Sequence, residues 1–402
     1  MSCGSSESGK PFFLKTLTDV QKGIYVEDWN ISADELDIGG EWSIKKARLK
    51  GGLSDGVDTI TVDNGKLSFV VVPTRGMGVW KGEYEGTFIG WDSPVKDLVH
   101  PRHVNLEARG GLGWLDGFNE WVVRCGLVSF GAPGVDTIVD NRGNKKEVTL
   151  TLHGRIANIP ASVVKVRLEP PFKMGVEGTI YEASMFGPQL KMTTSISTTP
   201  GSNSLKISDT IQNLRSSANE MQLLYHCNYG RPFLEEGAKL VAPIRQVAPR
   251  DAVAVKGIES FDVYGPPETG FVEQVYFIKP AAGSDGRTKA MLVNSDATKA
   301  VSIAFNTNEL PCLTVWKNTA AEEEGYVTGL EPGTNFPNPK PFERRRKRVV
   351  TLKAGEERRA EVILSVHMSE EEVREVSESI EEIQGKMKPK IFRNPSEDFS
   401  LV

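Results

Sequence analysis

Cysteine and long hydrophobic runs are both scarce in this sequence, and each scarcity excludes a class of protein. The four cysteines, Cys3, Cys125, Cys227 and Cys312, lie far apart and form no Cys-x-x-Cys pair, so neither a zinc knuckle nor a disulfide scaffold is expected. No segment reaches the roughly 18 uncharged apolar residues that a membrane helix needs. The first ten residues contain no apolar stretch of the kind found in a secretory signal. The sequence therefore predicts a cytoplasmic protein with reduced thiols and no membrane partner.

The chain also lacks a large excess of charge of either sign. Its 402 residues include 48 Lys+Arg and 53 Asp+Glu, a formal net charge of −5 that gives no electrostatic case for binding nucleic acid. The basic run 344–348 is a local exception. Because it directly precedes an expected strand and has no interleaved aromatic residues, we interpret it as a solvated edge that blocks strand pairing. We expect a folded, water-soluble protein without a nucleic-acid partner.

Short β-strand patterns dominate the chain. Alternating or β-branched runs separated by turn residues lie at 59–63, 67–73, 148–153, 192–197, 205–211, 221–225, 290–293, 300–305, 313–316, 349–352 and 360–366. They do not alternate with amphipathic helices, and 39 Gly and 23 Pro interrupt the chain between them, which disfavours parallel βαβ folds. We predict an all-β protein built as an antiparallel sandwich or barrel.

One helix is expected near the C-terminal end. Ser369 and Glu372 form a capping box before apolar residues at three- and four-residue spacing, and Gly385 ends the pattern. At the other end, residues 1–25 are polar and then mixed, and we predict that they form a tail leading into an N-terminal arm. No linker or internal repeat is evident, so residues 26–402 are predicted to form one domain that ends in the helix.

Unusual residues gather between Glu107 and Gly126. This stretch combines several glycines with aromatic, acidic, amide and basic side chains, which suits a plain strand poorly because glycine weakens strands and polar groups need partners. We interpret it as a shaped loop near a ligand, with a structural glycine-rich crossover as the equally weighted alternative. Arg75 and Trp91 lie in similar surroundings upstream. Such a mixture suits a polyhydroxylated ligand, since sugars offer both apolar C–H faces and hydroxyl groups.

The five histidines and a few carboxylates are the candidates for chemistry. His153 and His226 each follow a strand pattern and precede small or turn residues, although either one alone is more often structural. Glu331 lies between an apolar residue and a proline, where a rigid loop can position and desolvate a general base, with a surface-turn glutamate as the alternative. Glu273, flanked by apolar residues, is a second candidate. The remaining histidines are expected at the surface rather than on a metal: His100, His103 and His367.

Five motifs stand out: Pro73-Thr-Arg-Gly-Met-Gly78, Gly110-Gly-Leu-Gly-Trp-Leu-Asp-Gly-Phe-Asn119, Leu152-His-Gly-Arg155, Tyr225-His-Cys-Asn-Tyr-Gly230 and Gly329-Leu-Glu-Pro332. Together they resemble the aldose 1-epimerase (galactose mutarotase-like) superfamily, and most closely its DUF4432 branch. The resemblance runs from about Leu67 to His367. The fold that it implies is a large antiparallel β-supersandwich, in agreement with the strand patterns.

The resemblance also implies a site and a reaction. His226 would be a charged general acid, Glu331 an ionised general base, and His153 a hydrogen-bond partner for sugar oxygens, with ring opening interconverting the anomers of a small-molecule carbohydrate. No metal or organic cofactor is implied, and a monomer or homodimer is expected. The other residues expected to contact the sugar are Arg75, Trp91, Trp114, Asp116, Asn119, Arg124, Arg155, Asn228 and Glu273.

The sequence departs from typical mutarotases in ways that leave the sugar open. The motif around His226 reads Tyr-His-Cys-Asn-Tyr rather than Asn-His-x-Tyr-Phe-Asn, and the glycine-rich segment 110–126 is an insertion. Another hexose, a uronate or a derivatised sugar therefore fits as well as galactose or glucose. Two further functions remain open: another sugar isomerase or epimerase, with or without a metal bound by His and Glu, and a non-catalytic sugar-binding or sensing protein. Having His153, His226 and Glu331 together favours catalysis over binding alone.

Overall fold

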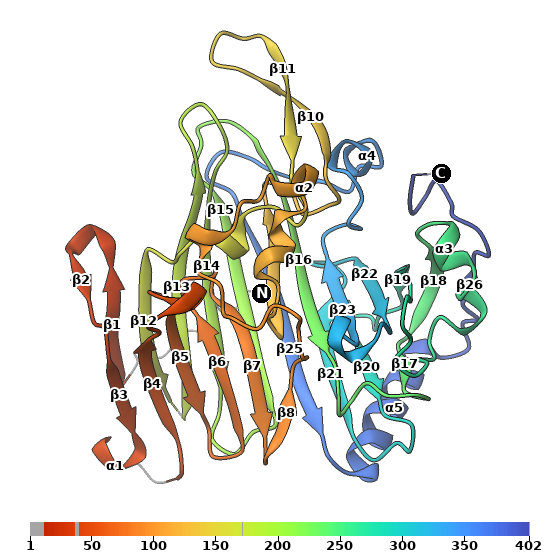
Figure 1. Ribbon diagram of the computed structural model, residues 1–402, viewed down its shortest axis with the longest axis horizontal. Helices are drawn as coiled ribbons and strands as arrows, with labels where there is room; N and C mark the ends of the chain where they lie inside the picture. The colour runs from red at the N-terminus through yellow and green to blue at the C-terminus, as the bar shows by residue number, and fades with distance from the viewer. Residues whose placement is uncertain (1–11, 37–39, 171, 402) are drawn as a thin grey trace, which may run out of the picture.

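Two large sheets form the molecule, which is known here from a computed structural model that describes residues 12–36, 40–170 and 172–401. Figure 1 shows their strands running side by side across the molecule, with α5 at one end. The ten-stranded sheet has the order β17 (Lys239–Val241), β20 (Arg287–Val293), β21 (Ala300–Asn306), β25 (Glu357–His367), β15 (Ser204–Asn213), β14 (Gln189–Thr198), β13 (Lys173–Ala183), β12 (Val163–Glu169), β1 (Phe13–Asp19) and β2 (Ile24–Tyr25).

The second sheet has fourteen strands and carries the candidate site. Its order is β26 (Lys390–Ile391), β18 (Ile244–Pro249), β19 (Gln274–Pro280), β22 (Cys312–Asn318), β23 (Val327–Gly333), β16 (Asn219–Tyr229), β9 (Val122–Leu127), β7 (Gly78–Tyr84), β6 (Leu67–Val72), β5 (Asp58–Asp63), β4 (Ser43–Arg48) and β3 (Trp29–Ser32), with β24 (Val350–Leu352) beside β16 and β8 (Thr87–Ile89) beside β7. All described pairings are antiparallel except β18 with β26. A separate hairpin of β10 (Gly134–Val139) and β11 (Lys145–Leu150) projects from the body (Figure 1).

The helical segments are short apart from one. The α-helices are α1 (Ala33–Leu36), α2 (Ala108–Gly111), α3 (Ala252–Val255), α4 (Lys340–Arg345) and α5 (Glu370–Gln384). The 3-10 segments are η1 (Val20–Lys22), η2 (Gly52–Ser54), η3 (Pro101–His103), η4 (Gly113–Gly117), η5 (Ile156–Asn158), η6 (Ile258–Ser260) and η7 (Glu322–Glu324). No helix among the described residues is both long and apolar enough to cross a membrane.

The main hydrophobic core lies between the two large sheets. Alternation places one face of each strand there: Leu205, Ile207 and Ile211 of β15 are fully buried and belong to the same apolar cluster as Tyr225 and Cys227 of β16. Because successive side chains point to opposite faces, the residues between them on β16 point away from this core. The antiparallel all-β class is thus confirmed, and each predicted run overlaps a strand, although the run 148–153 leaves β11 after Leu150.

The predicted C-terminal helix is also confirmed, and its capping explains where it begins. The Ser369 hydroxyl accepts a hydrogen bond from the Glu372 backbone N–H at 3.2 Å, and Gly385 follows the last turn. The N-terminal boundary differs from the prediction. Strand β1 pairs with β12 and buries Leu17, so the sandwich begins by residue 13 rather than 26, because β1 covers an edge that β12 would otherwise expose. Residues 1–11 lie outside the described part of the chain.

The interpretation of the basic run 344–348 as a solvated strand edge was wrong. Arg344 lies in the last turn of α4 and makes ion pairs with Asp136 of the hairpin at 2.8 Å and with Glu220 of β16 at 2.6 Å. Arg348 pairs with the buried Glu343. Arg344 thus joins α4 to the hairpin and the large sheet, whereas Arg348 ties the segment after α4 back to the helix.

The prediction of free thiols is confirmed for three cysteines, whereas the prediction of an exposed His367 is wrong. Cys125, Cys227 and Cys312 are free and buried, as expected, whereas Cys3 lies outside the described residues. His367 is not at the surface: it is buried at the end of β25, with its Nε2 atom 2.9 Å from the Ser302 hydroxyl.

Candidate functional site

A cavity of about 530 Å³ lies on the face of the fourteen-stranded sheet that points away from the main core. Strands β16, β22 and β23 supply His226, Thr314, Trp316 and Glu331, and loops from distant parts of the chain form the other walls. Neighbours of these residues, such as Cys227, point into the core instead. The strict alternation of the strands therefore separates a hydrophobic face from a face available for ligand.

His226 and Glu331 form a buried pair at this cavity. The strand partners Cys227 and Leu330 bring them opposite one another, and the His226 Nε2 atom lies 3.2 Å from Glu331 Oε1, with both side chains no more than 5 % exposed. Gly329 makes the approach possible. A Cβ atom at that position would lie 2.6 Å from Glu331 Oε1 and 3.2 Å from His226 Cε1, so any larger residue would displace the pair.

Asn228 fixes which nitrogen of His226 carries a proton. Its Nδ2 group donates to the carbonyls of Glu120 at 2.9 Å and of His226 itself at 3.3 Å, which leaves its Oδ1 atom to face His226 Nδ1 at 2.6 Å. Because that oxygen can only accept, Nδ1 must be the protonated nitrogen. The Nε2 atom that faces Glu331 and the cavity is therefore free to accept a proton in the neutral ring.

The electrostatic environment opposes charge on either member of the pair. Burial lowers the pKa of His226 well below its ordinary value, and the nearby His153 ring lowers it further. Burial raises the pKa of Glu331 well above its ordinary value, and the Glu273 carboxylate adds to the effect. Both pKa shifts favour a neutral His226 and a neutral Glu331, with one proton shared between His226 Nε2 and the Glu331 carboxyl. The resemblance, in contrast, implies an imidazolium and a carboxylate.

His153 lies beside this pair as a neutral hydrogen-bond acceptor. Its backbone is left-handed, with φ of 56°, and its Nδ1 atom donates to the Phe130 carbonyl at 3.2 Å. Burial lowers the pKa of His153 to about 4, so the ring is uncharged at neutral pH and its Nε2 atom has a free lone pair. The His153 and His226 ring centroids lie 5.3 Å apart.

Aromatic rings surround the two histidines. The ring centroid of Trp114 lies 4.5 Å from that of His153, while Phe118 and Trp316 lie 5.0 and 5.4 Å from His226. Each of these three aromatic residues lines the cavity. Such rings provide flat apolar surfaces of the kind that pack against the C–H faces of a sugar.

Several polar atoms at the cavity have no hydrogen-bond partner. Among the described residues, Trp114 Nε1, Thr314 Oγ1, Glu331 Oε1 and Ser400 Oγ are buried, line the cavity and make no hydrogen bond. Glu331 Oε1 approaches His226 Nε2 but outside hydrogen-bond geometry. Because buried polar atoms are normally satisfied, this group marks where ligand hydroxyls or water would bind.

A charged cluster borders the same cavity. Trp316 Nε1 donates to one Glu273 oxygen at 2.7 Å, and Arg250 donates to the other at 3.0 Å. Arg250 also donates to Asp251 at 2.7 Å, and Asp251 in turn caps α3. Glu273, predicted as a sugar contact, thus lines the cavity and also holds Trp316 in place.

The structure brings together only part of the predicted site. His226, Glu331, His153, Trp114 and Glu273 line the cavity. Two predicted residues lie behind it: Asn228 orients His226, and Trp91 packs on Phe118 with ring centroids 5.0 Å apart while donating from Nε1 to the Glu120 carbonyl.

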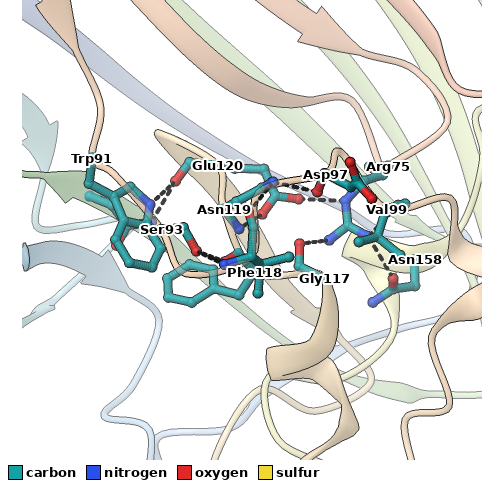
Figure 2. A network of polar contacts seen from close by, with 12 residues as sticks. Arg75, Trp91, Ser93, Asp97, Val99, Gly117, Phe118, Asn119, Glu120 and Asn158 are labelled. Carbon is teal, nitrogen blue, oxygen red and sulfur yellow. Dashed lines mark hydrogen bonds and ion pairs between the residues drawn. The ribbon is translucent and has the colours of Figure 1, made fainter. Parts of the chain in front are cut away.

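Arg75 and Asn119, predicted as ligand contacts, instead hold the glycine-rich segment in shape (Figure 2). Arg75 is fully buried, pairs with Glu120 at 2.7 Å, and donates to the carbonyls of Val99 and Gly117 and to the side chain of Asn158. Each of its three guanidinium nitrogens donates to the protein, and Arg75 does not line the cavity. The Asn119 amide donates to the carbonyls of Val95 and Asp97.

Three other predicted contacts lie away from the cavity. Arg124 is on β9, one residue out of phase with the cavity face, and pairs with Asp209 at 2.6 Å between the two sheets. Asp116 is partly exposed and pairs with Arg109, and Arg155 is exposed at the start of η5. A polar or charged residue in a suggestive motif can serve the protein scaffold alone.

Sequence reasoning missed Phe118, Thr314, Trp316, Arg250 and Asp251 as cavity residues. The signal available for Thr314 and Trp316 was their spacing of two on one strand, which puts both on one face, but the sequence does not say which face. Among the described residues no group of three or more His, Cys, Asp or Glu could hold a metal ion. That no metal is required stays a prediction.

Solved structures define the class to which the fold belongs. A crystal structure from Klebsiella pneumoniae, of a protein described as a "putative aldose 1-epimerase", matches with a TM-score of 0.90 and 36 % identity, over 95 % of this chain and 98 % of that chain. A galactose mutarotase-like protein from Clostridium acetobutylicum matches with a TM-score of 0.56 and 17 % identity, over 81 % of this chain and 98 % of that chain. The protein thus has the galactose mutarotase-like sandwich fold.

The family follows from the sequence match. The family described as "Domain of unknown function (DUF4432)" matches residues 54–366, and the chain belongs to this family, which confirms the resemblance found in its motifs. No curated protein matches the chain.

Proposed function

We propose that this protein is an aldose 1-epimerase that interconverts the anomers of a sugar through ring opening. The observation that carries the proposal is the buried His226–Glu331 pair, with a 3.2 Å separation, in a cavity lined by aromatic rings and unpartnered polar atoms. The description of the Klebsiella protein supports the same class of reaction.

The reaction needs one proton removed and one proton supplied. A base takes the proton of the anomeric hydroxyl, the electron pair forms the aldehyde C=O bond, and the bond from C1 to the ring oxygen breaks as that oxygen accepts a proton. Rotation about the C1–C2 bond and closure on the other face give the second anomer. Because both oxygens are bonded to C1, two protein groups as close as His226 Nε2 and Glu331 Oε1 can serve both of them.

One proton shared between His226 Nε2 and the Glu331 carboxyl is sufficient for this chemistry. When a sugar hydroxyl donates to the unpartnered Glu331 Oε1, it stabilises the carboxylate form, and the shared proton then resides on His226 Nε2. Glu331 is then the base that takes the anomeric proton, and His226 is the acid that protonates the ring oxygen. Closure of the ring reverses both transfers and restores the pair.

The remaining cavity residues would position the sugar. Trp114, Phe118 and Trp316 offer ring faces, while His153 Nε2 accepts a hydrogen bond and Thr314 Oγ1 can donate or accept one. Together they would fix the anomeric carbon over the acid and base. The carbohydrate partner, the cytoplasmic location, the absence of a cofactor and the monomeric or homodimeric state belong to this proposal as predictions.

The proposal is tested by NMR exchange between α and β anomers over a panel of neutral aldoses and uronates. Wild type should accelerate exchange, and Glu331→Gln and His226→Gln should each lower kcat by about 10²–10⁴. The exposed Asp116, which does not line the cavity, supplies a matched control, and Asp116→Asn should retain wild-type rates. Full activity in Glu331→Gln would rule out the assigned roles. Binding without acceleration of any sugar would favour a sugar-binding protein.

A further inference from the structure

The cavity has a second region, which the chemistry at His226 and Glu331 does not use. Leu112, Leu115 and Leu401 line it and remain 36 %, 40 % and 53 % exposed, so large aliphatic side chains border the opening. Leu152 and Pro133 extend the same apolar wall. These residues come from segments far apart in the chain, so their convergence on one opening is a product of the fold.

The cavity is large enough to hold a whole sugar. Its volume of about 530 Å³ falls within the range of roughly 300–1,000 Å³ that is typical of sites for drug-sized ligands. Unpartnered polar atoms line the cavity on Trp114, Thr314 and Glu331, and the Ser400 hydroxyl lies next to Leu401 in the chain. The leucine side chains themselves offer only apolar contact. A ligand that fills the cavity therefore needs both hydroxyl groups and an apolar group.

The charges at the cavity disfavour an anionic ligand. Arg250 is the one cation among the described residues that line it, and both Asp251 and Glu273 already engage its guanidinium. Glu331 adds a third carboxyl group, and burial keeps the two histidines uncharged. A carboxylate or phosphate on the sugar would face acidic groups with no free cation to pair with.

We infer that the substrate is a neutral aldose with an apolar substituent remote from its anomeric carbon, such as the methyl group of a 6-deoxy sugar, which packs against Leu112, Leu115 and Leu401. This inference rests on the proposed function, since the sugar occupies the same cavity with its anomeric carbon at His226 and Glu331. It narrows the range left open by the sequence, because it excludes uronates and favours sugars that lack a hydroxyl at the far end.

A series of sugars that differ only at C6 tests the inference. In both the galacto and the gluco configuration, the 6-deoxy sugar, the parent hexose and the uronate are compared by NMR anomer exchange. We expect kcat/KM to be on the order of 10-fold higher for the 6-deoxy sugar than for the hexose, and lowest for the uronate. Equal values across each series, or the highest value for the uronate, would overturn the inference while leaving the epimerase proposal intact.

Calorimetry of the same sugars binding to Glu331→Gln distinguishes failure of the epimerase proposal from failure of the inference about the apolar substituent. If the wild type accelerates no sugar, the epimerase proposal fails, yet tighter binding of the 6-deoxy sugars would still support the apolar region.

Replacing Leu115 by Asn should move the ratio of 6-deoxy to hexose activity towards one. Leu214, which is 42 % exposed and outside the cavity, gives the control, and Leu214→Asn should keep the wild-type ratio. An unchanged ratio in Leu115→Asn would count against the inference.

Discussion

Arg124 and Glu331 are both buried, and comparing them contrasts a polar group between the sheets with a polar group at the cavity. Arg124 lies between the sheets and donates to Asp209, to the Thr194 hydroxyl and to the Met77 carbonyl, so each of its three guanidinium nitrogens has an acceptor in the protein. Glu331 is equally buried, yet its Oε1 atom makes no hydrogen bond. Saturated groups rigidify a fold, whereas groups left incomplete in a cavity are prepared for a ligand.

The comparison between Arg124 and Glu331 is tested most directly by measuring both stability and activity on the same variants. For Glu331→Gln, which should lose about 10²–10⁴ in rate, we expect no loss of stability, because the variant removes an acid whose ionisation the fold opposes. Urea unfolding measures the free energy of unfolding. A marked fall in that free energy would mean that Glu331 belongs to the scaffold after all.

The opposite outcome is expected for the saturated pair. Arg124→Met leaves Asp209 buried without its cation, and breaking such a pair costs about 3–5 kcal/mol of stability. The variant should unfold at lower urea concentration, and any folded fraction should keep its kcat because Arg124 does not line the cavity. The double variant Arg124→Met/Asp209→Leu should recover part of the stability. A fully stable Arg124→Met with impaired catalysis would contradict the comparison.

A substitution at Gly329 tests whether the close approach of His226 and Glu331 matters for activity. A Cβ atom there would lie 2.6 Å from Glu331 Oε1, so Gly329→Ala should displace the carboxyl and lower kcat by roughly 10²-fold. Gly333 lies on the same strand, and its Cβ position has no contact shorter than 3.1 Å, which makes Gly333→Ala a milder comparison. Anomer exchange measures both variants. Equal rates in the two would mean that the separation of His226 and Glu331 is not critical.

The smallest expected effect concerns pH. Activity requires one proton shared between His226 Nε2 and the Glu331 carboxyl. At low pH a further proton binds to His226, whose pKa is lowered, and activity is lost. As the pH falls, the acid limb of kcat/KM should therefore lie below the ordinary histidine value of about 6.5. The alkaline limb, where the pair loses its last proton, reflects the raised pKa of Glu331. An acid limb at or above 6.5 would contradict an uncharged pair.

The sequence predicts the fold better than it predicts the site. Alternation identifies strands such as β15 because each inward residue is apolar, and the capping box locates α5. Strand β1 escapes detection because only its last residues are buried. Which face of a strand meets the cavity depends on register with a distant strand, so Arg124 was predicted as a ligand residue and Trp316 was not predicted at the cavity. Motif resemblance found His153, His226 and Glu331 because their local sequences are distinctive.

The cavity draws its lining from residues as far apart as Leu112 and Leu401. Forming this lining requires large loops to close, at a cost in entropy, in addition to the long-range strand pairings of the two sheets. We therefore expect that, during refolding from denaturant, β-sheet circular dichroism recovers before anomer exchange does. The functional site is in this sense the last part of the molecule to be assembled.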